Sequence, residues 1–111
     1  MRKTVLFSTL IFAFTLNADL KNSLDKEIDS LMEKVIEWRH DIHQYPELGN
    51  REFRTSKKIE DHLVSLGIQV ETKIAYTGVV GLIKGGMPGP TIALRADMDA
   101  LPVEEKTGLP F

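Results

Sequence analysis

The chain of 111 residues contains no cysteine. This absence excludes disulfide bonds as a support for a small fold, and it excludes a lipid-modified cysteine after a leader peptide. A basic stripe is also missing, because the 14 Lys and Arg residues are interspersed with the 16 Asp and Glu residues, as in residues 57–61. We therefore expect no nucleic-acid partner, and packing alone must stabilise the fold.

The sequence also lacks a long hydrophobic run. The apolar run at residues 5–16 is too short to span a bilayer comfortably, so we expect no stable membrane anchor. It follows Arg2 and Lys3 and precedes Ala18, which is typical of a secretory signal peptide. The sequence therefore predicts a signal peptide at residues 1–18, cleavage after Ala18, and export to the periplasm or the medium.

Apolar residues at alternating spacings of four and three predict a helix over residues 20–43, with one apolar stripe that we expect to be core. Pro46 ends this helix. A second helix is predicted from Arg51 or Glu52 to Leu66, with Gly67 just beyond its C-terminus. The stripe of the first helix consists of Leu24, Ile28, Leu31, Val35, Trp38 and Ile42. The inward positions of the second helix are Phe53, Ile59, Leu63 and Leu66.

The period then changes, and three strands are predicted at residues 68–74, 79–84 and 91–96. Glycine and proline at residues 85–90 indicate a turn, across which the last two strands are expected to form a hairpin. The order helix, helix, strand, strand, strand places the chain in the α/β class. Residues 19–111 contain no internal repeat and no second domain.

Two histidines, His40 and His43, lie three residues apart near the end of the first predicted helix, with Glu47 beyond them. They could present imidazoles to a metal. Pro46 interrupts the helix before Glu47, however, and the His-Glu-x-x-His pattern is absent. Packing and capping at the helix end is therefore the preferred interpretation.

Asp97 and Asp99 follow the apolar segment 91–96, and period-two geometry places both on one side of the chain. Carboxylates at the end of an apolar strand suit a site that binds a divalent metal or orients its histidine ligands. On spacing alone, a capped turn with an Arg95 ion pair is the more common role of such residues, because aspartate at strand ends commonly forms local hydrogen bonds. Spacing alone leaves both interpretations open.

Three blocks of sequence, in order, resemble the metal-dependent amidohydrolases typified by hippurate hydrolase, N-acyl-L-amino acid amidohydrolase and the plant auxin-conjugate (IAA-amino acid) hydrolases. The first is Trp38-Arg39-His40-Asp41-Ile42-His43-Gln44-Tyr45-Pro46-Glu47-Leu48-Gly49, followed by Glu52 and Thr55. The second is Thr77-Gly78-Val79-Val80-Gly81. The third runs from Ile92 through Asp97-Met98-Asp99 to Glu105, and continues from Thr107 to Phe111.

The resemblance implies a zinc-peptidase-like catalytic domain with a mixed sheet between helices, and a smaller inserted domain through which family members often form homodimers. It implies two divalent metal ions (Zn, Mn, Ni or Co) and hydrolysis of the amide bond of N-acyl amino acids such as hippurate. By the same resemblance, Asp99 lies next to the metals and orients a metal ligand. Asp97 is adjacent to the site, where related branches carry a ligand histidine.

The family's metal-binding segment, of the type His-Ala-Cys-Gly-His-Asp, is not among the 111 residues, and the resemblance implies that it follows Phe111. We therefore expect residues 19–111 to be the N-terminal portion of the catalytic domain, without the dimerisation domain, to bind no metal alone and to be inactive alone. Two alternatives stay open. The chain is a non-catalytic exported piece that binds or regulates a partner through its helical stripe or a strand edge, or it is an unstable truncated product.

Overall fold

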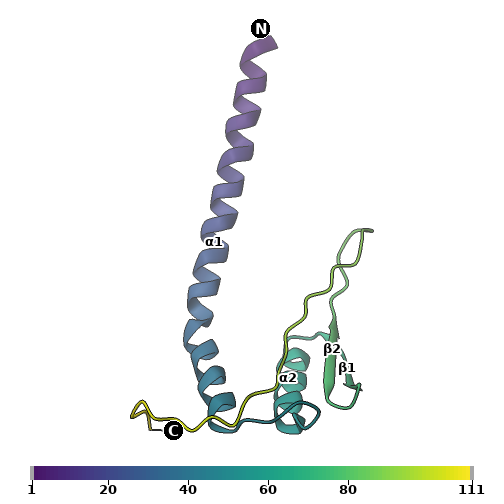
Figure 1. Cartoon of the computed structure of the whole chain (residues 1–111). Coiled ribbons are helices and arrows are strands. Elements are labelled where there is room, and N and C mark those ends of the chain that lie inside the picture. The colour runs from purple at the N-terminus through teal and green to yellow at the C-terminus, as the bar shows by residue number, and fades with distance from the viewer. Residues whose placement is uncertain (1, 111) are drawn as a thin grey trace. The chain divides into compact units, whose positions relative to one another are not determined.

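The computed structural model describes the backbone of residues 2–110 and the side chains of residues 19–110. Its elements are α1 (Arg2–Gln44), α2 (Phe53–Ser65), β1 (Gln69–Ile74) and β2 (Gly78–Leu82) (Figure 1). This composition agrees with the predicted α/β class. The chain divides into two compact units, residues 1–39 and residues 40–111, and each is described by itself.

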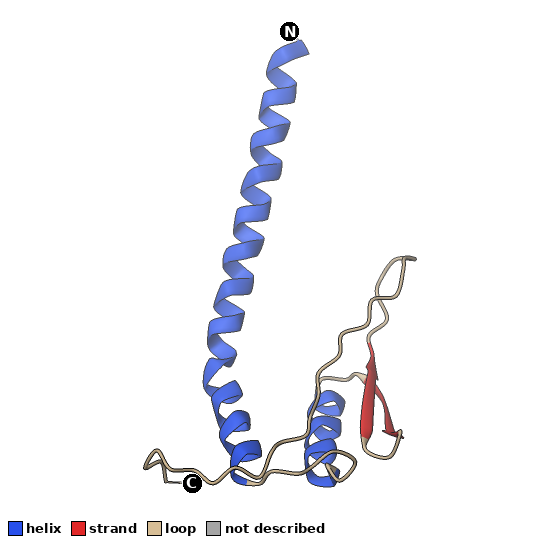
Figure 2. Ribbon diagram, in the orientation of Figure 1, coloured by secondary structure: helices blue, strands red, loops and turns tan. Residues whose placement is uncertain are grey.

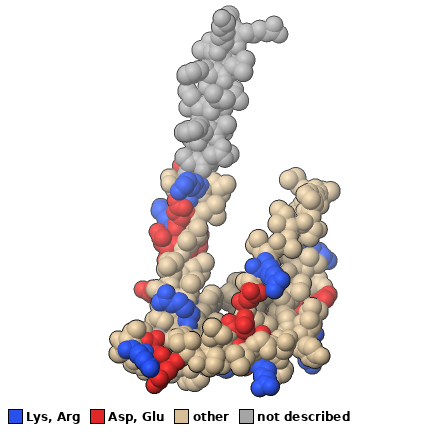
Figure 3. All heavy atoms as spheres, viewed as in Figure 1, with Lys and Arg blue, Asp and Glu red and all other residues tan. Residues whose placement is uncertain are grey.

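The first unit is the long N-terminal part of α1. The predicted helix over residues 20–43 lies within α1, which extends further toward the N-terminus and ends at Gln44, two residues before Pro46. Acidic and basic side chains are both present along its described part (Figure 3), with exposed pairs such as Lys21 and Asp25 at 2.5 Å. Such exposed pairs contribute little to stability.

The apolar stripe of α1 is not core within this unit. Leu24, Ile28 and Leu31 are 53%, 58% and 54% exposed, because no second element of residues 2–39 packs against them. The side chains of the predicted signal peptide, residues 1–18, lie outside the described ones, and that prediction stays a prediction. Within the described residues, no helix is both long enough and apolar enough to cross a membrane.

Helix α2 has the predicted position, with Glu52 at its N-cap and Leu66 at its C-cap. Gly67 follows with φ of 73°, the left-handed conformation in which glycine commonly terminates helices. Ile59 and Leu63 are half-buried as expected. The expectation was wrong for Phe53 and Leu66, which are 67% and 60% exposed because they lie at the two ends of the helix, beyond the face that the strands cover.

Strands β1 and β2 form an antiparallel hairpin, with Val70 opposite Gly81 and Ile74 opposite Gly78. Val70 and Thr72 are half-buried while their neighbours along β1 are exposed, as the period of two predicts, but Ile74 at the end of β1 is 44% exposed, which departs from that alternation. At the turn, a Cβ on Gly78 would lie 2.5 Å from the carbonyl oxygen of Ile74, so only glycine fits there. The hairpin packs on α2, since a Cβ on Gly81 would lie 3.3 Å from Leu63 Cδ1.

The third predicted strand, residues 91–96, is irregular, and the predicted hairpin across residues 85–90 is wrong (Figure 2). Strand pairing requires a hydrogen-bonded neighbour, and within residues 2–110 the sheet has only the two strands β1 and β2. Ile92 and Leu94 are accordingly 82% and 96% exposed. An apolar segment of the right length does not form a strand without such a partner.

Among the described side chains, no apolar one is fully buried. The buried residues are Glu52, Thr55 and Thr77, at 7%, 1% and 5% exposure. They lie at the start of α2 and just before β2, so the best-protected part of the chain is polar. The mixed sheet of a zinc-peptidase-like domain is not formed by residues 2–110, which contain only the two-stranded sheet.

Candidate functional site

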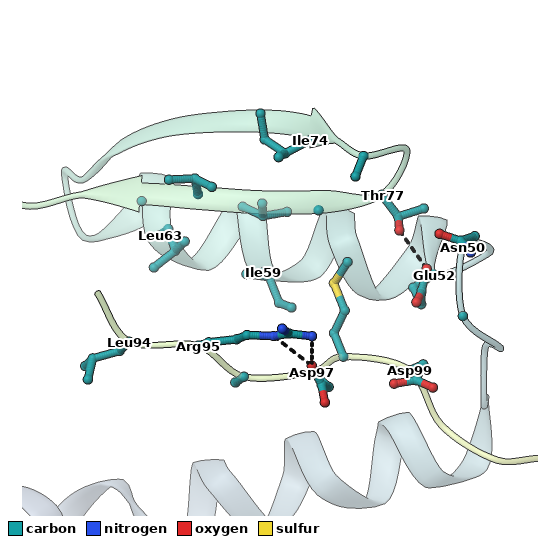
Figure 4. Close-up of a pocket in the computed structure, with 18 of the residues that line it drawn as sticks. Asn50, Glu52, Ile59, Leu63, Ile74, Thr77, Leu94, Arg95, Asp97 and Asp99 are labelled. Atoms are coloured by element: carbon teal, nitrogen blue, oxygen red, sulfur yellow. Dashed lines mark hydrogen bonds and ion pairs between the residues drawn. The ribbon is translucent and has the colours of Figure 1, made fainter. Parts of the chain in front are cut away.

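An open groove of about 1070 Å³ lies between the α2 and hairpin layer and the segment of residues 94–99 (Figure 4). Its apolar wall includes Ile59 and Leu63, which project from α2. Its polar lining consists of Asn50, Glu52, Thr77, Arg95, Asp97 and Asp99. Both aspartates that the sequence singled out therefore line one groove, together with residues of the connector between α1 and α2.

Asp97 is paired with Arg95. The guanidinium Nε and Nη2 lie 3.3 and 3.1 Å from Asp97 Oδ1 (Figure 4), so the ion pair that the sequence allowed is formed. The two side chains, Arg95 and Asp97, are 89% and 74% exposed, and such a pair contributes little to stability because water screens it. Asp97 is thus held loosely at the groove.

Asp99 lies against the connector between the helices. The backbone N–H of Ala100 donates to the carbonyl oxygen of Glu47 at 2.8 Å. A Cβ built on Gly49 would lie 4.0 Å from Asp99 Oδ2 and 4.0 Å from Glu52 Oε1. Residues far apart in the sequence are therefore neighbours, and sequence spacing did not predict this contact.

Glu47 caps α2. Its two carboxylate oxygens accept hydrogen bonds from the backbone N–H groups of Arg54 at 3.0 Å and Thr55 at 2.7 Å. These are the second and third helical residues, whose N–H groups lack partners inside the helix. Burial alone would raise the pKa of Glu47, but the N–H groups of Arg54 and Thr55 hold it below its usual value.

Glu52 occupies the N-cap position without capping the helix. Its carboxylate instead accepts the hydroxyl hydrogen of Thr77 at 2.6 Å, and this bond lowers the pKa of Glu52 (Figure 4). The bond joins the connector to the start of β2. In the sequence, Glu52 stands out only as a helix start and as part of the family block, and no local pattern distinguishes the bonding of Glu47 from that of Glu52.

The end of α1 is joined to α2 through Asp41, which accepts hydrogen bonds from Arg54 and Lys58. Arg54 first and Lys58 second lower the pKa of Asp41. The Arg54 guanidinium also lies 4.8 Å from the centre of the Tyr45 ring, within range of a cation–π interaction. One arginine thus connects the last turn of α1, the connector and the first turn of α2.

His43 contacts the C-terminal segment. Its Nε2 lies 2.8 Å from Glu105 Oε2, and Glu105 Oε1 accepts the backbone N–H and the hydroxyl of Thr107. The Thr107 hydroxyl, the Thr107 N–H and His43, in that order, lower the pKa of Glu105 to about 2. His43 and Glu47 therefore have partners at the helix end, as the packing interpretation proposed.

The described residues do not form a complete metal site. Within residues 19–110, no three or more His, Cys, Asp and Glu side chains are grouped closely enough to hold a metal ion. Asp97 and Asp99 line the groove without a histidine beside them in its lining. The ligand set implied by the family resemblance therefore does not fit the described residues by themselves.

The predicted metal-binding segment lies outside the described residues. That segment is expected to follow Phe111, and Phe111 itself lies outside the described residues, which end at Pro110. The C-terminal part that is described, from Ala100 to Pro110, contains no helix or strand. The expectation of a ligand motif after Phe111 therefore stays a prediction that rests on the family resemblance.

Comparison with known proteins relates this chain to hydrolases. It is 48% identical over 94 residues to thermostable carboxypeptidase 1 of Saccharolobus solfataricus, a match that covers 84% of this chain and 24% of that protein. N-acetyl-L-cysteine deacetylase of Bacillus subtilis is 49% identical over 84 residues, 76% of this chain and 20% of that protein. Hippurate hydrolase of Campylobacter jejuni is 45% identical over 89 residues, 80% of this chain and 23% of that protein.

The chain thus spans about a quarter or less of the length of these curated relatives. No family model matches it, and no solved structure matches it significantly. The identities nevertheless extend over most of the chain. By sequence, the chain is homologous over most of its length to the amidohydrolases that include hippurate hydrolase and N-acetylcysteine deacetylase.

Proposed function

We propose that this chain is part of an exported, metal-dependent amidohydrolase that cleaves the amide bond of N-acyl amino acids. The observation that carries the proposal is the position of Asp99 in the polar lining of the groove, together with Asp97, and against Gly49. The relatives' printed names support the substrate class, because hippurate and N-acetylcysteine are both N-acyl amino acids.

In this proposal, Asp99 orients a metal-binding side chain that lies outside residues 19–110, in the segment expected after Phe111, and Asp97 contributes negative charge beside it. Two divalent metal ions would supply carbonyl polarisation and an activated water. The described residues supply the orienting carboxylate of Asp99 and the turn of residues 47–52 against which it lies. We expect residues 19–111 alone to show no turnover. Among the described residues, no three metal-binding side chains lie close enough together to hold a metal ion.

The test is release of free amino acid from hippurate and N-acetylcysteine by the native gene product, after its intact mass has been measured. A product longer than this chain should hydrolyse an N-acyl amino acid, lose activity with a chelator and regain it with Zn²⁺ or Mn²⁺. Asp99→Asn should lower kcat by about ten- to a hundredfold, while Asp97→Asn should lower it less. A longer product that cleaves no member of an N-acyl amino acid panel contradicts the proposal.

A second candidate function is favoured by the exposed apolar side chains. Leu24, Ile28, Leu31 and Val35 of α1 are 46–58% exposed, more than is usual for a contiguous stripe. If the native product has the mass of residues 19–111, a binding or regulatory role through this stripe becomes the better proposal. The same mass measurement therefore separates the two candidates before any enzyme assay.

A further inference from the structure

We propose that Glu47 is a positioning residue that couples the start of α2 to the Asp97–Asp99 segment. Its carboxylate accepts the N–H groups of Arg54 and Thr55, and its carbonyl oxygen accepts the N–H of Ala100. One residue thus bonds to the first turn of α2 with its side chain, and to the residue after Asp99 with its backbone. The catalytic meaning of this coupling rests on the proposed function.

The contacts of the Glu47 side chain restrain the backbone of residue 47, and through it the backbone of Ala100. Both carboxylate oxygens of Glu47 are used, at 3.0 and 2.7 Å, so the side chain cannot turn without breaking a cap bond. Fixing the side chain restricts the backbone at residue 47, whose carbonyl oxygen lies 2.8 Å from Ala100 N. The backbone position of Asp99, directly before Ala100, is therefore tied to the N-terminus of α2.

The other side of the connector limits the freedom of Asp99. Gly49 lies against Asp99, and a Cβ there would be 4.0 Å from Asp99 Oδ2 and 4.0 Å from Glu52 Oε1. Glu52 is in turn 7% exposed and bonded to Thr77 at 2.6 Å. The turn of residues 47–52 therefore forms a platform that is anchored to α2 at Glu47 and to the hairpin at Glu52.

The experiment compares Glu47→Ala and Glu47→Gln with Asp41→Ala in this chain, by amide hydrogen exchange measured with NMR. Asp41→Ala is the matched control, because it removes the partner of Arg54 and Lys58 at the same helix without altering residue 47. The readout is the exchange rate of the Ala100 amide divided by that of Leu63, toward the end of α2. This ratio corrects for a general loss of helix stability, which a merely structural role would produce.

We expect the ratio to rise by about fivefold in Glu47→Ala, the change that corresponds to loss of one hydrogen bond, here the one from the Ala100 amide to the Glu47 carbonyl oxygen. Glu47→Gln keeps only one of the two acceptor oxygens, so its ratio should rise less than that of Glu47→Ala but stay above that of wild type. If Glu47→Ala does not fold, Glu47→Gln is the deciding variant, and a ratio equal to that of wild type overturns the inference. The control should leave the ratio unchanged. The same ratio in Glu47→Gln, Glu47→Ala and wild type would overturn the inference.

A second readout uses the longer native product, if it is an amidase. Glu47→Gln and Glu47→Ala should lower kcat, the alanine variant more, with little change in KM, because a misplaced Asp99 affects the reacting centre more than substrate binding. Unchanged kcat in Glu47→Ala, with amidase activity present, refutes the positioning role while the proposed function stands. An exchange response in a product without amidase activity supports the coupling and refutes the proposed function.

Discussion

At the scale of single residues, the carboxylates near the groove are distinguished by their donors. Glu47 accepts hydrogen bonds from two backbone N–H groups, and Glu52 accepts one from the hydroxyl of Thr77. Glu105 accepts hydrogen bonds from the hydroxyl and the N–H of Thr107, and its other oxygen lies at hydrogen-bond distance from the His43 ring. Asp97 is paired with the exposed Arg95. These three glutamates are thus engaged in structural hydrogen bonds. Of the carboxylates that line the groove, Glu52 is bonded to Thr77, which leaves Asp97 and Asp99 as the candidates for chemistry.

The lowered pKa of Glu105 predicts a specific dependence on pH. Its pKa falls from 4.5 to about 2, so the contacts of the charged form stabilise the folded chain fully above pH 4.5, and this contribution is lost as the pH falls through 2. NMR titration of the Glu105 carboxyl carbon should show a midpoint near 2. Thr107→Val removes the hydroxyl that lowers the pKa of Glu105 most, so it should move the midpoint upward toward 4.5.

Thr107→Ser is the matched control for this titration, because it keeps the hydroxyl that donates to Glu105. Its midpoint should remain close to that of the wild type. A wild-type midpoint near 4.5, or equal midpoints in the valine and serine variants, would contradict the assignment of the shift to the Thr107 hydroxyl.

Thr55 gives a second prediction at this scale. It is 1% exposed and its Oγ1 makes no well-formed hydrogen bond, although it lies near enough to Glu47 to help lower the pKa of that carboxylate. Thr55→Val keeps the shape and removes the poorly satisfied hydroxyl. We expect its free energy of unfolding to be within about 0.5 kcal/mol of wild type, or higher, in urea titration.

Thr55→Ala is the comparison variant, because it removes the methyl group together with the hydroxyl. It should cost about 1 kcal/mol through lost packing. If Thr55→Val were as destabilising as Thr55→Ala, the hydroxyl would instead be a necessary partner of Glu47.

At the scale of elements, α2 organises the second unit. The last turn of α1 reaches it through Asp41, the connector reaches it through Glu47, and the hairpin packs on Leu63. The hairpin itself contains strain. Ala75 and Tyr76 have φ of 47° and 86°, the left-handed region that the favoured hairpin turns use and that glycine adopts at no steric cost.

Tyr76→Gly should therefore stabilise the hairpin. The ring is 78% exposed, so its loss removes little buried surface, while relief of the left-handed conformation should contribute about 1 kcal/mol. Tyr76→Ala is the matched control, because it removes the ring but keeps the Cβ. Equal urea midpoints for the glycine and alanine variants would argue against strain at this turn.

At the scale of the whole molecule, burial is the decisive quantity. No described apolar side chain is fully buried, and many large hydrophobic residues are exposed, among them Leu31 at 54%. Exposed apolar surface of this extent favours association. We expect residues 19–111 to bind a hydrophobic dye and to self-associate with rising concentration in analytical ultracentrifugation.

Leu31→Glu, in the middle of the α1 stripe, should reduce this association, because it places a charge on the apolar face. Ser30→Glu adds the same charge one position away, outside the stripe, and should reduce association less. A chain that stays monomeric at all concentrations, or equal effects of the two substitutions, would show that the stripe is not the associating surface.

The sequence by itself determined what depends on neighbours along the chain. The 3.6-residue period and Gly67 defined α2 to within about two residues, Pro46 placed the end of α1, and alternation identified the two faces of β1. Torsional preference and periodicity are local properties, which is why α2 and β1 lie close to their predicted positions.

Only the tertiary structure decided which distant residues meet. It placed the Ala100 N–H on the Glu47 carbonyl, Glu105 on His43, and Thr77 on Glu52, and it left residues 91–96 without a strand partner. Such contacts depend on how the chain closes its loops, and any of several carboxylates could have capped α2 on local grounds. The sequence identified Asp99 as a candidate site residue. The turn of residues 47–52 against which Asp99 lies is in place only because chain closure brings this turn and residue 100 together.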